Sequence, residues 1–187
     1  MKITNTNFLN FSATIPKIKL QVQNKTSKEF IPATFYLVDG EDILDYKEFQ
    51  LGSEWEYGDV LSKSTQRHHS FNHHYKIKTD NNETIAICRV GDLYANAYDI
   101  EYLESKPNSN YKYSGRAILA CIAKEILNWG GNTLKVLDPL ASAYSFYEET
   151  CGFNCKGKHP QMNKKDMEEF ITRTEKDIGC ELLDIKS

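Results

Sequence analysis

The sequence lacks long apolar runs, a targeting segment and repeats. Nowhere in its 187 residues is there an uninterrupted apolar stretch of the length that a membrane-spanning helix needs. Met1 to Ser12 mixes polar and single apolar residues, without the basic start and apolar run of a secretory signal. Internal repeats and low-complexity tracts are also missing. The chain is therefore expected to form one globular domain in the cytoplasm.

Charge of one sign is also scarce. The 23 Lys and Arg residues nearly balance the 26 Asp and Glu residues, which gives a formal net charge of -3. This balance offers no electrostatic case for a nucleic-acid partner or an anionic membrane surface. A slightly acidic chain suits a cationic amine substrate. The sequence leaves a homodimer open.

Cysteine and histidine do not form recognisable metal or redox motifs. Without a secretory signal, the odd count of five cysteines favours reduced thiols. Cys151 and Cys155 are too far apart for a CxxC motif, and Cys121 is expected in the core. Four of the five histidines fall between His68 and His74, with no acidic or cysteine partner at metal-ligand spacing. We expect no metal and interpret this run as a polar loop, which could flank an acceptor pocket.

The hydrophobic pattern predicts strands followed by a helix, a strand and further helices. In the N-terminal part, residues 15–22 suggest an extended segment, residues 31–38 a strand, and residues 43–49 a short helix or strand. The later signals are sharper. They predict a hairpin of 75–79 with 84–90, a strand at 97–105, a helix at 115–129, a strand at 133–137, a helix at 141–150, a strand from Phe153, and a helix at 163–178 capped by Asn163.

This order predicts an α/β (α+β) domain with three layers. We expect a single domain over residues 1–187, with a variable N-terminal part (1–74), a cofactor-binding core (75–153) and a C-terminal extension (154–187).

The turn from Lys112 to Ala117 is the segment that points to a ligand. Gly115 has no Cβ, so the backbone there can approach a ligand closely. The N–H groups at the start of the following helix have no intrahelical partner, and the positive end of the helix dipole lies behind them. Such a helix start binds phosphate, although a Gly before a helix is a weak signal by itself.

The stretch from about Ala97 to Phe153 resembles the core of the GNAT N-acetyltransferase superfamily. Its pyrophosphate loop has Arg or Gln, two residues, Gly, one residue, then Gly or Ala; this chain has Lys112-x-x-Gly115-x-Ala117. Its later helix ends in Phe/Leu-Tyr-Glu-x-x-Gly-Phe, which matches Phe146 to Phe153. Some members end their fourth strand like Glu104-x-x-Pro107-Asn108.

The resemblance implies a mixed, mostly antiparallel central sheet flanked by helices, and acetyl-CoA as co-substrate. Three features depart from the pattern: Lys112 replaces Arg or Gln, the spacing from Pro107 to Lys112 is longer, and Leu140 replaces an Asn that usually contacts the cofactor. The implied cofactor-binding residues are Leu103, Ser105, Lys112, Tyr113, Ser114, Gly115, Arg116, Ala117 and Tyr147.

The resemblance also implies direct attack of an amine on the thioester. An aliphatic amine has a pKa of ~10 and must first lose a proton, for which Glu104 is the first candidate base and Glu101 the second. Each of these could equally be a solvated charge at a strand edge. Tyr147 resembles the family's general acid, which would protonate the leaving thiolate. A backbone N–H of residues 103–105 would meet the oxyanion.

Two other functions compete with acetyl transfer to an unknown amine. The first is a non-catalytic acyl-CoA-binding or protein-interaction module with the same fold, against which the retained Tyr147 argues. The second is a nucleotide-phosphate-binding enzyme, which is disfavoured because the sequence has neither GxxxxGK[ST] nor GxGxxG.

Overall fold

The computed structural model describes residues 14–38, 49, 72–93 and 96–185. Its strands are β1 (Thr14–Asn24), β2 (Phe30–Val38), β3 (Asn72–Thr79), β4 (Thr84–Leu93), β5 (Ala97–Ser105), β6 (Tyr111–Lys112), β7 (Thr133–Val136), β8 (Gln161–Asn163) and β9 (Leu183–Asp184). Its helices are α2 (Ser114–Asn128), a 3₁₀ turn η2 (Ala141–Ala143), a π-helix η3 (Phe146–Cys151) and α3 (Lys164–Ile178).

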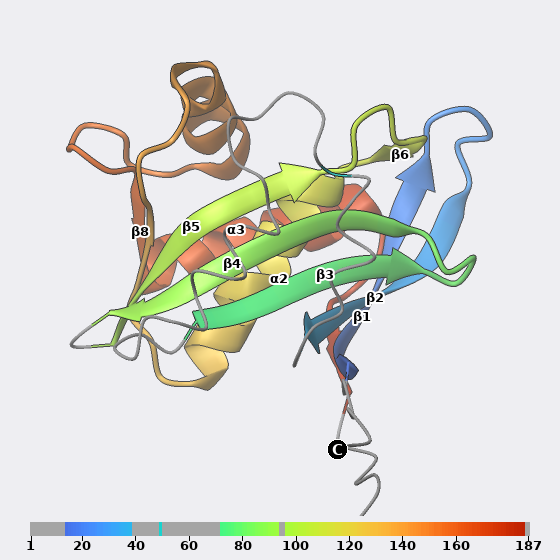
Figure 1. The fold of residues 1–187 in the computed structure, drawn as a ribbon, viewed down its shortest axis with the longest axis horizontal. Coiled ribbons are helices and arrows are strands. Elements are labelled where there is room, and N and C mark those ends of the chain that lie inside the picture. The colour runs from blue at the N-terminus through green and yellow to red at the C-terminus, as the bar shows by residue number, and fades with distance from the viewer. Residues whose placement is uncertain (1–13, 39–48, 50–71, 94–95, 186–187) are drawn as a thin grey trace, which may run out of the picture.

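The strands form one sheet in the order β6-β1-β2-β3-β4-β5-β7-β8, and β9 also pairs with β1. Among the described strands, β5 and β7 form the one parallel pair. Figure 1 shows α2 and α3 behind strands β3 to β5, so both helices cover the same face. We call this the helix face and the opposite one the second face. The expected mixed, mostly antiparallel sheet with flanking helices is confirmed.

Apolar side chains fill the space between the helix face and α2. Nearly every residue in the first three turns of α2 is buried, as its wide apolar stripe predicts. From the sheet, Phe35 of β2 stacks on Tyr75 of β3 with ring centroids 4.8 Å apart. Both rings are almost fully buried. Burying a side chain of this size contributes about 1.5–3 kcal/mol, so this layer dominates the stability of the domain.

The neighbours of β5 change along its length. Its pairing with β4 shifts register where Arg89 opposes Tyr102 and Val90 opposes Ile100, which leaves Glu101 as a bulge. On the other side, β5 pairs with β7 from Ala97 to Ile100. The Leu137 N–H donates to the Ile100 carbonyl at 3.0 Å. Beyond that bond β5 continues to Ser105 without β7, so a gap opens between the two strands.

The C-terminal helix α3 begins and ends where its sequence predicts. Asn163 is its cap, and Asn163 and Asp166 exchange side-chain-to-backbone hydrogen bonds in a capping box. Gly179 ends the helix in the left-handed region at φ 70°. None of the helices that the structure describes combines the length and hydrophobicity of a membrane span.

Three sequence expectations need correction. Residues 141–150 do not form a regular α-helix. A 3₁₀ turn (η2) comes first, followed by a very short α-helical stretch and then by the π-helix η3. Phe153 does not open a strand; Asn154 makes an isolated bridge to Gln161, where β8 begins. His73 and His74 lie within β3 rather than in a loop. The expected loops and short elements of residues 39–48 and 50–71 lie outside the described residues.

Candidate functional site

Helix α2 begins without any side-chain cap. Its cap position, Tyr113, lies in the left-handed region at φ 65° and offers no side-chain hydrogen bond. The first turn contains no acidic residue. The N–H groups of Ser114, Gly115 and Arg116 therefore face outward at the positive end of the helix dipole, where an anion is favoured. The next N–H, of Ala117, already donates to Tyr113 at 2.7 Å, and the Ala117 side chain is buried in the core.

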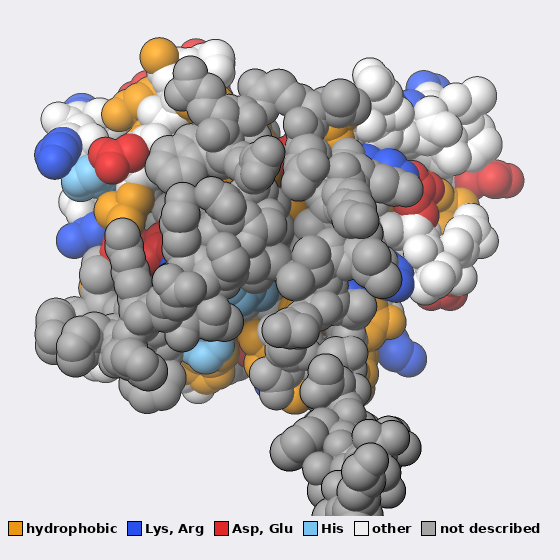
Figure 2. Space-filling model, viewed as in Figure 1, with side chains coloured by type: hydrophobic (Ala, Val, Ile, Leu, Met, Phe, Trp, Pro, Cys, Tyr) orange, Lys and Arg blue, Asp and Glu red, His pale blue; other side chains and the backbone are white. Residues whose placement is uncertain are grey.

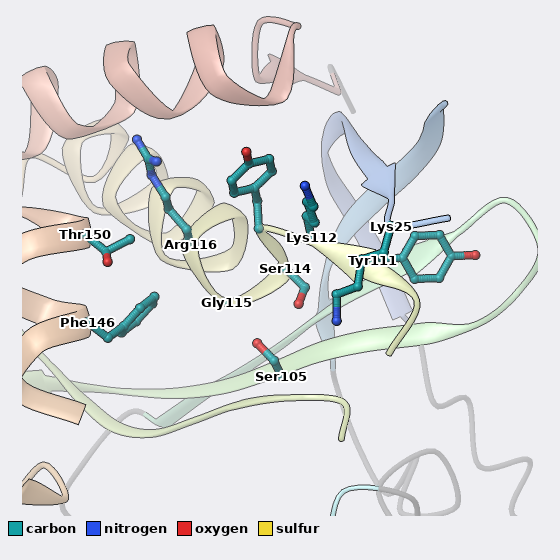
Figure 3. A pocket seen from close by; sticks show the side chains of 10 residues that line it. Lys25, Ser105, Tyr111, Lys112, Ser114, Gly115, Arg116, Phe146 and Thr150 are labelled. Atoms are coloured by element: carbon teal, nitrogen blue, oxygen red, sulfur yellow. The ribbon is translucent and has the colours of Figure 1, made fainter. Parts of the chain in front are cut away.

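The helix start opens onto a cavity of about 390 Å³. Figure 3 shows Ser105 of β5 directly beside Gly115, with Phe146 and Thr150 of the segment after β7 on the far side. A Cβ on Gly115 would lie 2.8 Å from the Ser105 Oγ, closer than ordinary side chains approach. Glycine is thus required for the packing of α2 against β5, as well as for backbone approach to a ligand.

The two cations of the predicted loop are placed differently. Arg116 points toward α3, where its Nη1 lies 2.5 Å from Asp177 and its Nε donates to Thr174 at 3.2 Å (Figure 3). Its charge is therefore already paired within the fold. Arg116 also lines the cavity, and so does Lys112 of β6. Among the described residues Lys112 has no ion-pair partner, so Lys112 is the better source of positive charge for a bound anion.

The long spacing between Pro107 and Lys112 has a structural reason that the sequence did not reveal. Residues 111–112 form β6, which pairs with residues 23–24 of β1. Lys25, just after β1, extends this contact because its N–H donates to Asn110 and its Nζ donates to Ser109, each at 2.6 Å. The loop is therefore held at the edge of the sheet, and Lys25 becomes a wall of the cavity.

Backbone donors of β5 face the gap beside β7. The Lys106 N–H donates to Ile85 of β4 at 2.9 Å. In an antiparallel ladder alternate residues point the same way, so Glu104 directs its N–H toward β4 as well. Leu103 and Ser105 then direct theirs to the opposite side, where β7 has diverged. These are the two residues for which the sequence predicts backbone contacts.

Tyr147 lies in the π-helix η3, between Phe146 and Phe153. The Tyr147 ring meets both rings edge to face, with centroids 5.3 and 5.5 Å apart. Burial raises the pKa of Tyr147 well above its usual range, and the nearby thiols of Cys88 and Cys151 add to the effect. The phenol therefore keeps its proton at neutral pH, as a proton donor must. Cys88 pairs with Leu103 in the sheet, which places Tyr147 near the β5 donors.

The two predicted bases lie on the second face of β5. Tyr102 donates a hydrogen bond to the Glu104 carboxylate, and burial raises the pKa of Glu104 despite that bond. Glu101, at the bulge, is exposed, and one of its oxygens lies 2.8 Å from the Arg89 Nε. The bulge brings Glu101 and Glu104 near the same surface, whereas a regular strand would place them on opposite faces.

Asp99 is a third carboxylate on this face, and sequence reasoning missed it. It is 3% exposed, and its Oδ1 is buried without a hydrogen-bond partner. Burial raises the pKa of Asp99 to about 6. In sequence it is one charged residue in an alternating strand. The signal that could have found it is its position two residues before the bulge at Glu101. That position becomes informative only once β4 and β7 are known to pair on either side of β5.

The second face carries charge of both signs. Figure 2 views the molecule from this side, and Lys, Arg, Asp and Glu side chains are visible on the described parts around its margins. Across residues 14–38, 49, 72–93 and 96–185, no group of three or more His, Cys, Asp or Glu side chains could hold a metal ion. The five cysteines are free thiols; Cys121 and Cys151 are buried and Cys155 is half-buried.

Solved structures with the same arrangement of elements define the fold. A protein of the GNAT family from Desulfovibrio desulfuricans superposes with a TM-score of 0.57, over 71% of this chain and 99% of that chain, at 19% identity. The ribosomal-protein-S18-alanine N-acetyltransferase from Escherichia coli gives a TM-score of 0.51 over 69% and 89%, also at 19% identity. A Bacillus subtilis acetyltransferase in complex with CoA gives 0.52 over 66% and 77%, at 14% identity.

This chain therefore has the fold of the GNAT superfamily of acetyltransferases. No protein-family model and no curated protein matches the sequence. At such low identities the likeness concerns the fold alone, so the activity has to be argued from the site.

Proposed function

We propose that this protein is an N-acetyltransferase that moves the acetyl group of acetyl-CoA to a primary amine of a small molecule or a protein. One observation carries the proposal: the uncapped start of α2 opens onto a cavity that adjoins the gap between β5 and β7. A phosphate-binding helix start beside an open strand edge suits a ligand with a pyrophosphate and an extended amide-bearing arm.

The residues present fit coenzyme A. The N–H groups of Ser114 to Arg116 and the charge of Lys112 would hold the pyrophosphate. The arm of the ligand contains amides that need partners, and Leu103 and Ser105 direct N–H groups into the gap. Gly115 keeps the entrance narrow but free of a Cβ. When bound, acetyl-CoA supplies the thioester whose acetyl group is transferred.

The acceptor amine must lose a proton before it can attack. An ordinary ammonium has a pKa of ~10, so a carboxylate near the thioester is needed, acting directly or through water. We assign this role to Asp99 first, because its pKa of about 6 is near the working range and its Oδ1 has no partner. Glu104 is the second candidate. Glu101 is third because Arg89 already balances its charge.

The remaining steps need positioning and one proton donor. The neutral nitrogen attacks the thioester carbonyl carbon and forms the C–N bond, and a β5 N–H stabilises the oxyanion. The C–S bond then breaks. The Tyr147 hydroxyl gives its proton to the departing thiolate and recovers one from the nitrogen. The products are the amide, free coenzyme A and the proton released from the ammonium.

Binding and turnover test the proposal separately. Calorimetric titration of the intact protein with acetyl-CoA should show micromolar binding, and a library of amines should then be screened for release of free thiol. Dephosphorylated coenzyme A serves as the comparison ligand for the contribution of the terminal phosphate. Binding without thiol release for any amine would favour the non-catalytic acyl-CoA-binding module. No binding would remove the proposal.

A further inference from the structure

A cluster of titratable groups lies on the second face where β5 and β7 part. In register, Asp99 of β5 is opposite Lys135 of β7, and Lys135 is opposite Gln161 of β8. Tyr98 and Ile100, on either side of Asp99, belong to the core against the helices. Because side chains alternate along a strand, Asp99 and the rest of this row face the other way.

His159 joins this cluster through the backbone of the loop before β8. The Val136 N–H donates to the Pro160 carbonyl at 2.9 Å, which continues the antiparallel pairing of β7 with β8 by one step. His159 therefore comes opposite Leu137, on the same face as Lys135. Leu137 also makes the last bond from β7 to β5. His159 thus borders the point where the gap opens.

Within the described part of the chain, two buried polar atoms in this cluster have no hydrogen-bond partner: the Asp99 Oδ1 and the His159 Nδ1. Leaving such an atom unpaired is destabilising, and folded proteins rarely do so. Asp99 is almost completely buried, whereas His159 is only half-buried. One group of the pair thus lies inside the protein, and the other reaches toward solvent.

We propose that His159 is a positioning residue that acts through Asp99, receiving the proton that Asp99 takes from the acceptor and passing it to solvent. This inference rests on the proposed acetyl transfer. The proton leaves the ammonium nitrogen for an Asp99 oxygen, passes through water to the imidazole of His159, and is lost to bulk water. Asp99 is then ionised again for the next turnover, and no other reactant is needed.

The charges around Asp99 are suited to this role. Burial raises the pKa of Asp99 to about 6, and Glu101 on the same strand adds to the rise. Lys135 from β7 and His159 from the loop before β8 both lower it. Across the sheet on β4, Asp99 is opposite Gly91, which carries no charge. A carboxyl with a pKa of about 6 can take up a proton and release it again near neutral pH.

The first test needs neither acetyl-CoA nor an amine. The Asp99 carboxyl is followed by ¹³C NMR through a pH titration of the full chain, in the wild type and in His159→Gln. Removing the imidazole should raise the pKa of Asp99, because His159 lowers it in the wild type. An unchanged Asp99 titration would overturn the inference whatever the enzyme does.

The second test separates proton transfer from simple electrostatics. His159→Ala should lower kcat/KM by about tenfold or more and move the acid limb of the pH profile upward. Added imidazole should restore much of the loss. Lys135→Gln should also raise the pKa of Asp99, but imidazole should not rescue it, because imidazole replaces the side chain of histidine and not that of lysine. If imidazole restores kcat/KM in both variants, or in neither, the proposed proton transfer through His159 is overturned.

The two tests also distinguish this inference from the proposed function. If Asp99 responds to His159→Gln but no amine releases thiol, the acetyl transfer fails, and only the electrostatic effect of His159 on Asp99 stands, without its proposed purpose. If thiol release is robust and unaffected in His159→Ala, acetyl transfer stands and the inference falls. Should His159→Ala fold poorly by thermal melting, His159→Asn replaces it in the second test.

Discussion

The two faces of the sheet are built for different purposes. On the helix face, apolar side chains such as Phe35, Ile77 and Ile100 are fully buried against α2 and α3. On the second face, the same strands bury Lys76 and Asp99, which are only 1% and 3% exposed. Burying charge costs stability unless it is compensated. The helix face therefore holds most of the apolar core, and the second face is where a chemical role has to be sought.

Loss of the Tyr147 hydroxyl should have the largest effect on turnover. It tests the role proposed for the residue on the helix face, beside β5. Tyr147→Phe should lower kcat by about 10²- to 10⁴-fold, because the departing thiolate loses its proton donor. Affinity for acetyl-CoA should change little, since the aromatic contacts with Phe146 and Phe153 remain. Tyr144→Phe, in the same segment, is the matched control. Unchanged kcat in Tyr147→Phe would remove Tyr147 as the acid.

Two neighbouring residues of β2 allow the faces to be compared directly. Phe35→Ala should cost about 3–5 kcal/mol of unfolding free energy, because it empties a fully buried site beside Tyr75. Tyr36 points to the second face and is half-buried, so Tyr36→Ala should cost clearly less. Urea unfolding measures both. Equal losses would contradict the assignment of stability to the helix face.

Gly115 tests whether the start of α2 is a ligand site. In Gly115→Ala the new Cβ meets the Ser105 Oγ at 2.8 Å, so both stability and affinity for acetyl-CoA should fall, the affinity by about tenfold or more. The double variant Ser105→Ala, Gly115→Ala removes the crowding oxygen. It should recover stability by thermal melting while affinity by calorimetry stays low. Full recovery of affinity would mean that Gly115 serves packing alone.

Asp99→Asn should make the protein more stable at neutral pH. In the wild type, the folded pKa of Asp99 is about 6, above the ordinary value near 3.9. The protonated carboxyl therefore contributes its full share of the unfolding free energy below pH 4, and this share is lost as pH rises toward and through 6. Above pH 6 the wild type buries a charge that the amide avoids, a difference of about 3 kcal/mol. Urea unfolding at pH 4.5 and 7.5 measures it. A variant less stable than wild type at both pH values would contradict this account.

The parts predicted correctly from sequence are those that local patterns determine. The strand over residues 97–105 alternates and ends before Pro107, and the helix over 115–129 carries its own apolar stripe and stop signal. Gly115, in the first turn of that helix, was singled out for the same local reason, and its role in binding a ligand stays a prediction. These features depend on neighbours within a few residues along the chain.

The parts that were missed depend on contacts between distant segments. The pairing of β6 with β1 explains the long loop, yet the two strands are nearly ninety residues apart. Arg116 looked available for phosphate until α3 supplied Asp177 as its partner. Asp99 gains its burial and its raised pKa only because β7 and the His159 loop come together beside it. No local pattern in the sequence contains that information.

The most direct test of the central claim is calorimetric titration of the intact protein with acetyl-CoA. The account predicts one micromolar site, with affinity weakened in Gly115→Ala and in Lys112→Gln, since the start of α2 and its unpaired lysine hold the pyrophosphate. Absence of binding at millimolar acetyl-CoA would contradict it, and the start of α2 would then be only a helix end packed on Ser105.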